Sequence, residues 1–381
     1  MVANGGAYSI LPRDLPPDEK RKIGGVMLFC AGSGFGLLNA LLVKLHYFRE
    51  DSADILIPGG GVWNRWAEGL CHTGIFNRVW TNDGAAERER AARLLWDEGH
   101  EKEAVRMVLG DREIPTGHKS FFLVGDSRFG KAAYYTLAHR GVAPKLSLVE
   151  GGIASYIENI SQRHHWPEKD HTAEKRLEAM YLYRPLLDQG GSEKPVFRIP
   201  QLTEHPEGMA AVRSIFGAET LPGARYIFLA DDTSRLPGAS DHLGILDKLG
   251  AMVGKENILV RPHPTVEEWT PLFRVHGYHV LDSTVPWEVL AALDERPRRV
   301  ITAIASHGAM TGWLASGKHW PMLLLKNLSV ISRHWYFDAP VYNHFLQAVK
   351  SAADKDGSEL FLPHNAKELS LVVEYLRRGD F

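Results

Sequence analysis

The sequence predicts an α/β protein with two Rossmann-like lobes that face a cleft. Short apolar runs alternate with helix-length segments along most of the 381 residues, and they do so in two successive series of similar size. Several of these runs, such as residues 258–260, 279–281 and 300–304, end in polar, loop-forming segments. That pattern is typical of buried parallel strands whose carboxyl ends build a site.

The first series covers the N-terminal part of the chain. Residues 87–108 carry Arg and Glu at helical spacings and predict a solvated helix, whereas the charged, histidine-rich residues 162–184 predict helix or loop. The other expected strands are residues 26–30, 53–58, 120–124 and 145–149, and the other expected helices are residues 37–48 and 131–139.

The second series follows a stretch rich in proline and glycine, residues 196–223. Its expected strands are residues 226–230, 258–260, 279–281, 300–305 and 321–325, and its expected helices are residues 242–252, 267–276, 286–293, 342–353 and 366–378. The predicted organisation is a flexible lead-in (1–22), an N-terminal acceptor-side lobe (23–200), an inter-domain passage (201–222), a C-terminal nucleotide-sugar lobe (223–335) and terminal helices (336–381).

Composition narrows the class of protein. A hydrophobic content of 44% and a charged content of 24% are those of an ordinary globular protein, and a net charge of −2 argues against a nucleic-acid partner. Cys30 and Cys71 are too few for a disulfide scaffold and fit a reducing compartment. Residues 23–43 are uncharged and nearly long enough to span a membrane, but five glycines favour a strand, a glycine loop and a helix.

The loop after residues 258–260 carries the first candidate site residues. Arg261 and His263 stand here, and His263 lies between Pro262 and Pro264. Each proline restricts its own φ and the residue before it, so the loop holds the imidazole in a narrow conformational range. An imidazole held in this way is suited to binding a phosphate.

The order of several motifs resembles the bacterial sialyltransferases, in particular the lipooligosaccharide type and the related polysialyltransferases, over about residues 25–330. Their HP motif corresponds to His263-Pro264, and a D-x-x-x-P-x-E segment to Asp282, Pro286 and Glu288. A later strand ends in Ser306-His307. Upstream, an acidic-acidic-Gly motif followed by I-x-S-Y corresponds to Val149-Glu150-Gly151-Gly152-Ile153-Ala154-Ser155-Tyr156.

This resemblance implies the GT-B architecture and an inverting, metal-independent transfer of sialic acid, a related nonulosonic acid or Kdo from a CMP-sugar to a surface glycan such as lipopolysaccharide or capsule. The departing CMP gains negative charge, so its phosphate needs donors. His263 is the expected catalytic donor. The expected CMP-binding residues are Arg261, His263, Pro264, Ser306, His307 and Thr311, and those on the acceptor side are Gly32, Ser33, Gly34, Asp126 and Ser127.

This chain departs from the motifs of the sialyltransferases at the position of the general base. The family places the base on the second acidic residue, and Gly151 stands at that position. Glu150, one residue earlier, is the expected base, with Asp126 and Glu158 as alternatives. If none of them serves, the chain is a binding relative that holds a nucleotide or glycan without transferring a sugar.

Three other patterns indicate different chemistry. Gly32-Ser33-Gly34-Phe35-Gly36 misses the dinucleotide fingerprint, because Leu37 occupies the third small position and no acidic residue ends the next strand. Gly125-Asp126-Ser127-Arg128-Phe129-Gly130 fails the hydrolase spacing by one residue, so helix capping is favoured and a serine hydrolase is the lesser alternative. The pair Asp231-Asp232, and likewise His164, His165 and His171, lack the partners of a metal site.

The resemblance also implies partners, and the sequence predicts a location. Besides a CMP-sugar donor and a glycan or glycolipid acceptor, a cytoplasmic protein is expected, with a place at the inner face of the bacterial inner membrane, peripheral membrane association and a homodimer as further options. No cofactor and no nucleic acid are expected.

Overall fold

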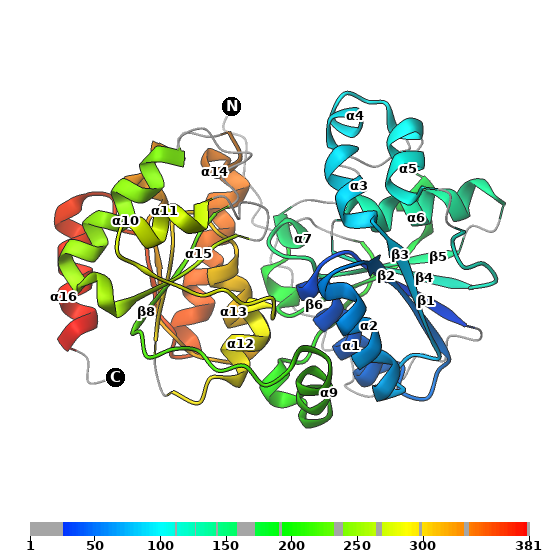
Figure 1. The fold of residues 1–381 in the computed structure, drawn as a ribbon, viewed down its shortest axis with the longest axis horizontal. Coiled ribbons are helices and arrows are strands. Elements are labelled where there is room, and N and C mark those ends of the chain that lie inside the picture. The colour runs from blue at the N-terminus through cyan, green and yellow to red at the C-terminus, as the bar shows by residue number, and fades with distance from the viewer. Residues whose placement is uncertain are drawn as a thin grey trace, which may run out of the picture.

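The computed structural model describes residues 26–110, 113–125, 127–141, 144–157, 172–189, 193–231, 239–263, 269–296, 299–330 and 335–378. Two α/β lobes stand side by side (Figure 1). Each is built on one sheet in which every strand pairing is parallel. The predicted fold class is therefore confirmed.

The N-terminal sheet has seven strands in the order β3-β2-β1-β4-β5-β6-β7. Its strands are β1 (Met27–Ala31), β2 (Ala53–Gly59), β3 (Arg78–Asp83), β4 (Ser120–Val124), β5 (Lys145–Val149), β6 (Leu177–Leu182) and β7 (Val196–Arg198). Its helices are α1 (Gly34–Tyr47), α2 (Val62–Thr73), α3 (Ala85–Ala91), α4 (Arg93–Asp97), α5 (Glu101–Leu109), α6 (Arg128–His139), α7 (Ala154–Ile157) and α8 (Thr172–Arg176).

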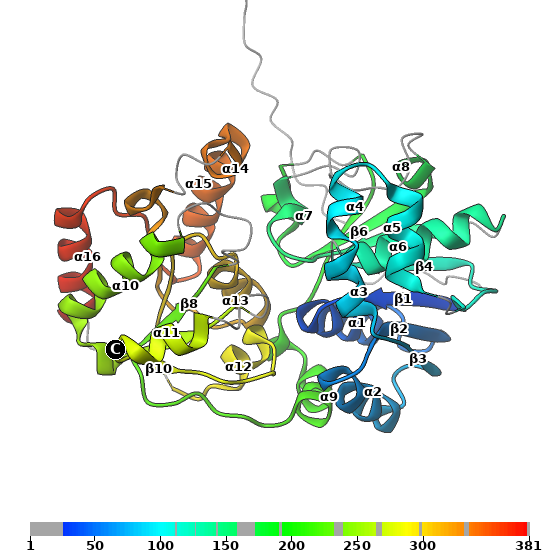
Figure 2. The same ribbon diagram turned by 45° about the horizontal axis from the view of Figure 1, so that its top comes forward.

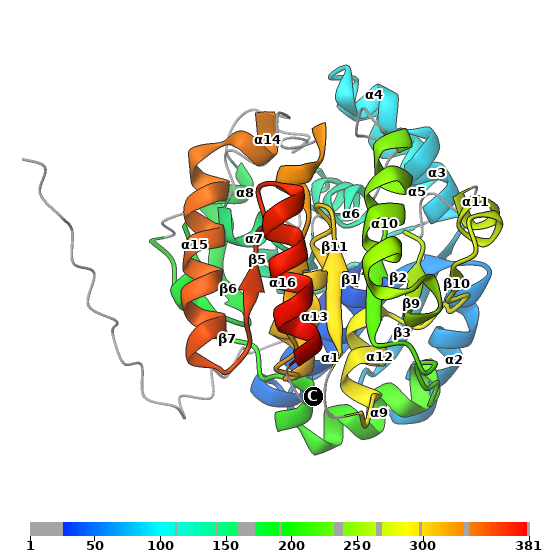
Figure 3. The same cartoon turned by 90° about the vertical axis from the view of Figure 1, so that its left-hand side faces the viewer.

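The C-terminal sheet has six strands in the order β10-β9-β8-β11-β12-β13. They are β8 (Tyr226–Leu229), β9 (Ile258–Arg261), β10 (His279–Val280), β11 (Val300–Ala303), β12 (Met322–Leu324) and β13 (Leu360–Phe361). Helices α10 (Ala239–Val253), α11 (Thr270–Val275), α12 (Trp287–Leu293), α13 (Gly308–Ser316), α14 (Trp335–Asp338), α15 (Pro340–Lys355) and α16 (Ala366–Arg378) surround it, as Figure 3 shows from the side of this lobe.

Two segments join the lobes. The passage after β7 contains α9 (Pro206–Phe216), which packs against α1 and α2 of the N-terminal lobe (Figure 2). Helix α15 packs against α7, where the rings of Tyr156 and Phe345 lie 5.5 Å apart. Arg184 forms an ion pair with Asp356 at the end of α15. The terminal region is therefore part of the junction as well as of the C-terminal lobe.

Several expected elements need correction. The single helix predicted for residues 87–108 is three helices, and Gly99, with a positive φ of 84°, separates the second of them, α4, from the third, α5. Residues 177–182 form strand β6, although the charged stretch 162–184 predicted helix or loop. Of the rest of this stretch, residues 172–176 form α8, residues 183–184 follow β6 without regular structure, and residues 162–171 lie outside the described ranges. Strands β3, β7 and β13 were not predicted.

Residues 26–43 form strand, turn and helix, as predicted for that stretch. No helix in the described part of the chain is both long and apolar enough to cross a membrane. The predicted flexible lead-in, His164, His165, His171 and Asp232 lie outside the described residues.

Candidate functional site

A cleft of about 1100 Å³ lies between the two lobes, and residues from both lobes line it. In the C-terminal sheet it lies at the point where the strand order reverses, between β8 and β11. Loops after β1 and β5 contribute from the N-terminal sheet, and loops after β8, β9 and β11 contribute from the C-terminal sheet. Ligands of open α/β sheets bind at such switch points because neighbouring loops diverge there and leave a crevice.

The lobes meet closely at Gly34. A Cβ atom at this position would lie 2.8 Å from the side chain of Pro286 in the other lobe and 3.1 Å from the ring of Trp66. Glycine is therefore needed for the approach of the two lobes. Ser33, beside it, caps α1 by accepting a hydrogen bond from the Gly36 amide at 3.0 Å, and both Ser33 and Gly34 line the cleft.

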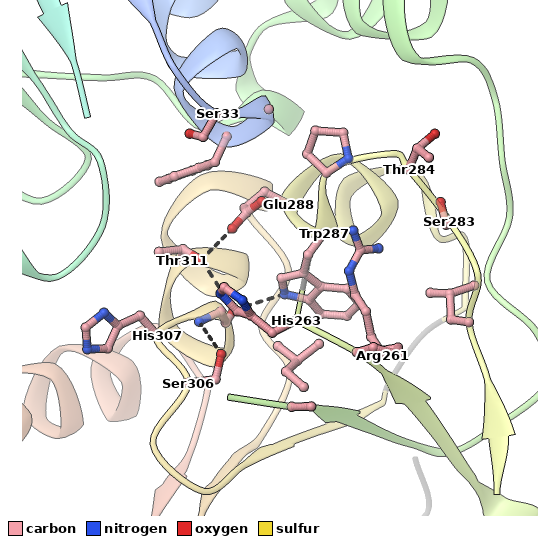
Figure 4. Close-up of a pocket in the computed structure, with 18 of the residues that line it drawn as sticks. Ser33, Arg261, His263, Ser283, Thr284, Trp287, Glu288, Ser306, His307 and Thr311 are labelled. Carbon is pink, nitrogen blue, oxygen red and sulfur yellow. Dashed lines mark hydrogen bonds between the residues drawn. The ribbon is translucent and has the colours of Figure 1, made fainter. Parts of the chain in front are cut away.

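On the C-terminal side, the loops after β9 and β11 flank the end of β8 and enclose one end of the cleft (Figure 4). The first loop supplies Arg261 and His263, and the second supplies Ser306 and His307. Thr311 follows in α13, whose N-terminus opens at the cleft with Gly308. The structure thus brings together all the described residues that the sequence assigned to CMP binding. Pro264 lies outside the described residues.

Arg261 is held in place by backbone. Its Nη2 donates a hydrogen bond to the Val285 carbonyl at 2.6 Å, and its Nη1 has no hydrogen-bond partner among the described residues. Burial lowers the pKa of the guanidinium, and the carboxyl groups of Glu288 and Glu219 oppose this change. An arginine keeps its charge under these conditions, so the cleft has a fixed cation with an unused donor.

His307 has a different electrostatic environment. Burial lowers the pKa of its imidazole to about 4; nearby Asp231 raises that pKa and His263 lowers it further. His307 is therefore neutral at physiological pH. Asp231 itself accepts hydrogen bonds from the Ala305 amide at 3.1 and 3.3 Å, so this carboxylate fixes the loop that carries Ser306.

Two adjacent residues of α12 complete this wall. Glu288 is 6% exposed, and its Oε1 accepts a hydrogen bond from the Thr311 hydroxyl at 2.5 Å. Burial raises the pKa of Glu288. The Trp287 indole donates to the Gly308 carbonyl at 2.9 Å and so ties α12 to the start of α13. Glu288 belonged to a motif quoted above, but no role was assigned to it.

The opposite wall contains cleft residues that the sequence analysis did not identify. Trp63 and Trp66 lie one helical turn apart on α2, with ring centroids 4.9 Å apart, and both line the cleft. Arg90 comes from a segment that was read as solvated, and Phe35 from the glycine loop. The spacing of the two tryptophans directly after Gly59-Gly60-Gly61 was the available signal.

Glu150, the expected base, does not line the cleft, whereas Gly151 and Gly152 do. The Glu150 side chain is fully buried. Its Oε2 accepts hydrogen bonds from the Tyr156 hydroxyl at 2.5 Å and from the Tyr183 amide at 2.8 Å, and its Oε1 has no partner among the described residues. Neighbouring residues of a strand point to opposite faces, and here the carboxyl group points into the lobe.

Burial raises the pKa of Glu150 to about 8; hydrogen bonds from Tyr156 and Tyr183 lower it, and Glu288 raises it. The carboxyl is therefore mostly protonated at neutral pH, when a general base has to be ionised. Of the alternative bases, Asp126 and Glu158 lie outside the described residues. The position and the raised pKa of Glu150 therefore do not support its assignment as the general base.

This raised pKa leads to a prediction about stability. Because the folded carboxyl binds its proton more tightly than the unfolded one, whose pKa lies near 4.5, the unfolding free energy falls as pH rises from about 4.5 to 8, by about 1.4 kcal/mol per pH unit. Glu150→Gln removes this dependence. Between pH 5.5 and 7.5, we expect the variant to gain about 3 kcal/mol relative to the natural chain in urea unfolding. Glu103→Gln on exposed α5 is the control, and equal slopes for all three proteins would contradict the prediction.

Two residues expected on the acceptor side, Ser127 and Gly32, have structural roles. Ser127 accepts a hydrogen bond from the Gly130 amide at 3.0 Å and caps α6, as the capping interpretation predicts, and Ser127 is not among the cleft-lining residues. Gly32 packs against it, since a Cβ there would lie 2.4 Å from the Ser127 Oγ. Within the described ranges, no three His, Cys, Asp or Glu side chains converge as a metal site requires.

Among solved structures, the chain is similar to the UDP-GlcNAc 2-epimerase of Methanocaldococcus jannaschii. One structure of that enzyme matches with a TM-score of 0.51 and 10% identity, and another, in complex with UDP-GlcNAc and UDP, with 0.50 and 12%; each match covers 93% of both chains. The chain has a GT-B-like fold. The glycosyltransferase SnogD of Streptomyces nogalater matches with a TM-score of 0.45 and 13% identity over 92% of this chain and all of its own.

Neither a protein-family model nor a curated protein sequence matches the chain. At identities this low, the structural similarity establishes the fold alone. This structural similarity does not establish the resemblance to sialyltransferases. Evidence for the activity has to come from the residues of the site.

Proposed function

We propose that this protein is a nucleotide-sugar-dependent glycosyltransferase whose donor is a CMP-sugar, carrying sialic acid, a related nonulosonic acid or Kdo, and whose acceptor is a glycan hydroxyl. One observation carries the proposal: Arg261, His263 and Ser306, on loops 45 residues apart in sequence, line one end of the cleft together. These residues supply the groups that a leaving phosphate requires.

The reaction transfers charge to that phosphate. When the bond between the sugar and CMP breaks, the phosphate goes from one negative charge towards two. The Arg261 guanidinium supplies fixed positive charge, and the His263 imidazole donates a hydrogen bond or a proton. The N-terminus of α13, a helix of nine residues, opens at the same place, so its helix dipole favours negative charge there. Ser306, whose Oγ accepts a hydrogen bond from the Gly308 amide, can donate its hydroxyl to the phosphate.

A single phosphate can be stabilised by these groups without a divalent cation, so we propose a metal-independent reaction. Glu288 suits a neighbouring role. One of its oxygens is held by Thr311, and a carboxylate fixed in this way can accept hydrogen bonds from nucleoside hydroxyls. The aromatic wall of Trp63 and Trp66 faces the acceptor side, where the apolar face of a sugar ring can stack.

A binding relative without transfer is the second candidate. The observation that favours it is the position of Glu150, which is buried outside the cleft while glycine occupies position 151. In that case the nucleotide site is used for recognition or regulation. A serine hydrolase receives no such support, because Ser127 is engaged as a helix cap.

Calorimetry with CMP, UMP and UDP tests the donor class. We expect CMP to bind, and to bind at least about tenfold more tightly than UMP or UDP, with the same affinity in EDTA. UDP binding without CMP binding would refute the CMP-sugar proposal and favour a UDP-sugar, which is what one of the similar epimerase structures contains. Release of CMP from a CMP-sugar only when a glycan acceptor is present would identify a transferase; CMP binding without release would identify the binding relative.

A further inference from the structure

A second cavity, which we call the basal pocket, lies at the opposite edge of the N-terminal sheet from the cleft. Its volume is about 810 Å³. The residues that line it include some at the amino ends of four strands. Val26 precedes β1, Ser52 precedes β2, Arg78 is the first residue of β3 and His118 precedes β4. With strands of five to seven residues at about 3.3 Å each, about 15–25 Å of sheet separates it from the cleft.

The floor of the basal pocket is a buried polar pair. Asp54 and His118 are 6% and 7% exposed, and the Asp54 Oδ2 lies 3.0 Å from the His118 Nε2. The same oxygen accepts a hydrogen bond from the Trp80 indole at 3.4 Å. The His118 Nδ1 is buried and has no hydrogen-bond partner among the described residues. Buried polar atoms are nearly always paired, so an unpaired one at a cavity indicates a missing water or ligand group.

Trp80 forms one wall of the basal pocket. It is on the edge strand β3 and 36% exposed, which is unusual for the largest apolar side chain. Its hydrogen bond to Asp54 restrains the ring although the side chain remains partly exposed. A restrained, exposed aromatic ring loses little conformational freedom when a ligand stacks on it, and stacking is therefore favoured.

The rim of the basal pocket carries balanced charge. Arg78 and Arg140 provide two guanidinium groups, and Glu113 provides an exposed carboxylate in addition to buried Asp54. Asn77 adds an amide, although its Oδ1 accepts hydrogen bonds from Ser52 and the Ala53 amide. With two positive and two negative groups among its described lining residues, the basal pocket does not favour a phosphate or a polyanion. These groups suit a neutral ligand that both donates and accepts many hydrogen bonds.

We propose that the basal pocket is a saccharide-binding site. A pyranose ring has an apolar C–H face, which stacks on Trp80, and a rim of hydroxyl groups. Those hydroxyls donate to Glu113 and accept from Arg78 and Arg140, and one of them satisfies the His118 Nδ1 directly or through a water. The site is separate from the cleft and does not depend on the donor proposed above.

Saturation-transfer NMR with the methyl glycosides of galactose, N-acetylglucosamine and N-acetylneuraminic acid tests this assignment, with CMP present. We expect at least one glycoside to give ring-proton signals that Trp80→Ala reduces at least about fivefold and Trp80→Phe restores. Arg140→Ala should weaken the same signals. Tyr375→Ala, which removes an exposed aromatic ring on α16 that lines neither the cleft nor the basal pocket, is the matched control and should leave them unchanged.

Two results would overturn the proposal. One is that no glycoside gives a signal, and the other is that the signals persist in Trp80→Ala and disappear in Trp63→Ala, which would place the sugar in the cleft. Thermal unfolding and CMP calorimetry on each variant distinguish these outcomes from misfolding. Because Trp80 is at an edge, we expect the CMP affinity of its variants to match the natural chain, so failure here leaves the donor proposal intact.

Discussion

His263→Ala is expected to weaken CMP binding about tenfold and to slow sugar transfer by about 10²–10³-fold. The imidazole lines the cleft next to Arg261 and the start of α13, where charge develops on the departing phosphate. Its hydrogen bond strengthens as that charge grows, so the loss should be larger for the transition state than for bound CMP. Calorimetry gives the affinity, and single-turnover transfer from a CMP-sugar gives the rate.

His279→Ala is the control for this experiment. His279 is an exposed histidine on β10 of the same lobe and is not among the residues lining the cleft. Its variant should match the natural chain in both measurements. If His263→Ala keeps the natural affinity and rate, His263 has no part in the site, and the phosphate assignment loses its proton donor.

Gly151→Asp is expected to raise the transfer rate by about 10²-fold or more and to leave CMP affinity within about threefold. Position 151 lines the cleft, and the resemblance places the general base there. An Asp carboxylate at the cleft wall would be hydrated and ionised at neutral pH. In the natural chain, the nearest acidic residue in sequence, Glu150, is buried and carries a raised pKa of about 8.

Glu150→Gln separates the two assignments of the base. The amide oxygen of glutamine can still accept from Tyr156 and Tyr183, so the local structure should be kept. We expect its transfer rate to stay within about tenfold of the natural chain. A loss of about 10²-fold or more with unchanged CMP affinity would instead make Glu150 the base and show that its side chain reaches the cleft during turnover. No transfer by the natural chain, with transfer by Gly151→Asp, would identify a binding relative.

The sequence by itself predicted the two-lobed fold and several of the residues that line the cleft. Buried parallel strands are short apolar runs, so β4 and β5 were predicted with the bounds observed, and β1, β2, β8, β9 and β11 within a few residues. Arg261, His263 and Ser306 were predicted to meet because loops at the carboxyl ends of neighbouring strands share one edge of a sheet. Strand β3 escaped prediction because it is an edge strand, with mostly exposed residues and no apolar run.

Only the tertiary structure decided which way the critical side chains point and which distant segments meet. The strand period leaves Glu150 equally free to face the cleft or the lobe, and Tyr156 and Tyr183, six and 33 residues away, direct it inward. Gly34 and Pro286 approach across the lobes, a contact that sequence spacing does not encode. The basal pocket likewise joins Asp54, Trp80 and His118 from three separate segments. Local patterns record burial and periodicity, whereas these contacts depend on how whole elements pack.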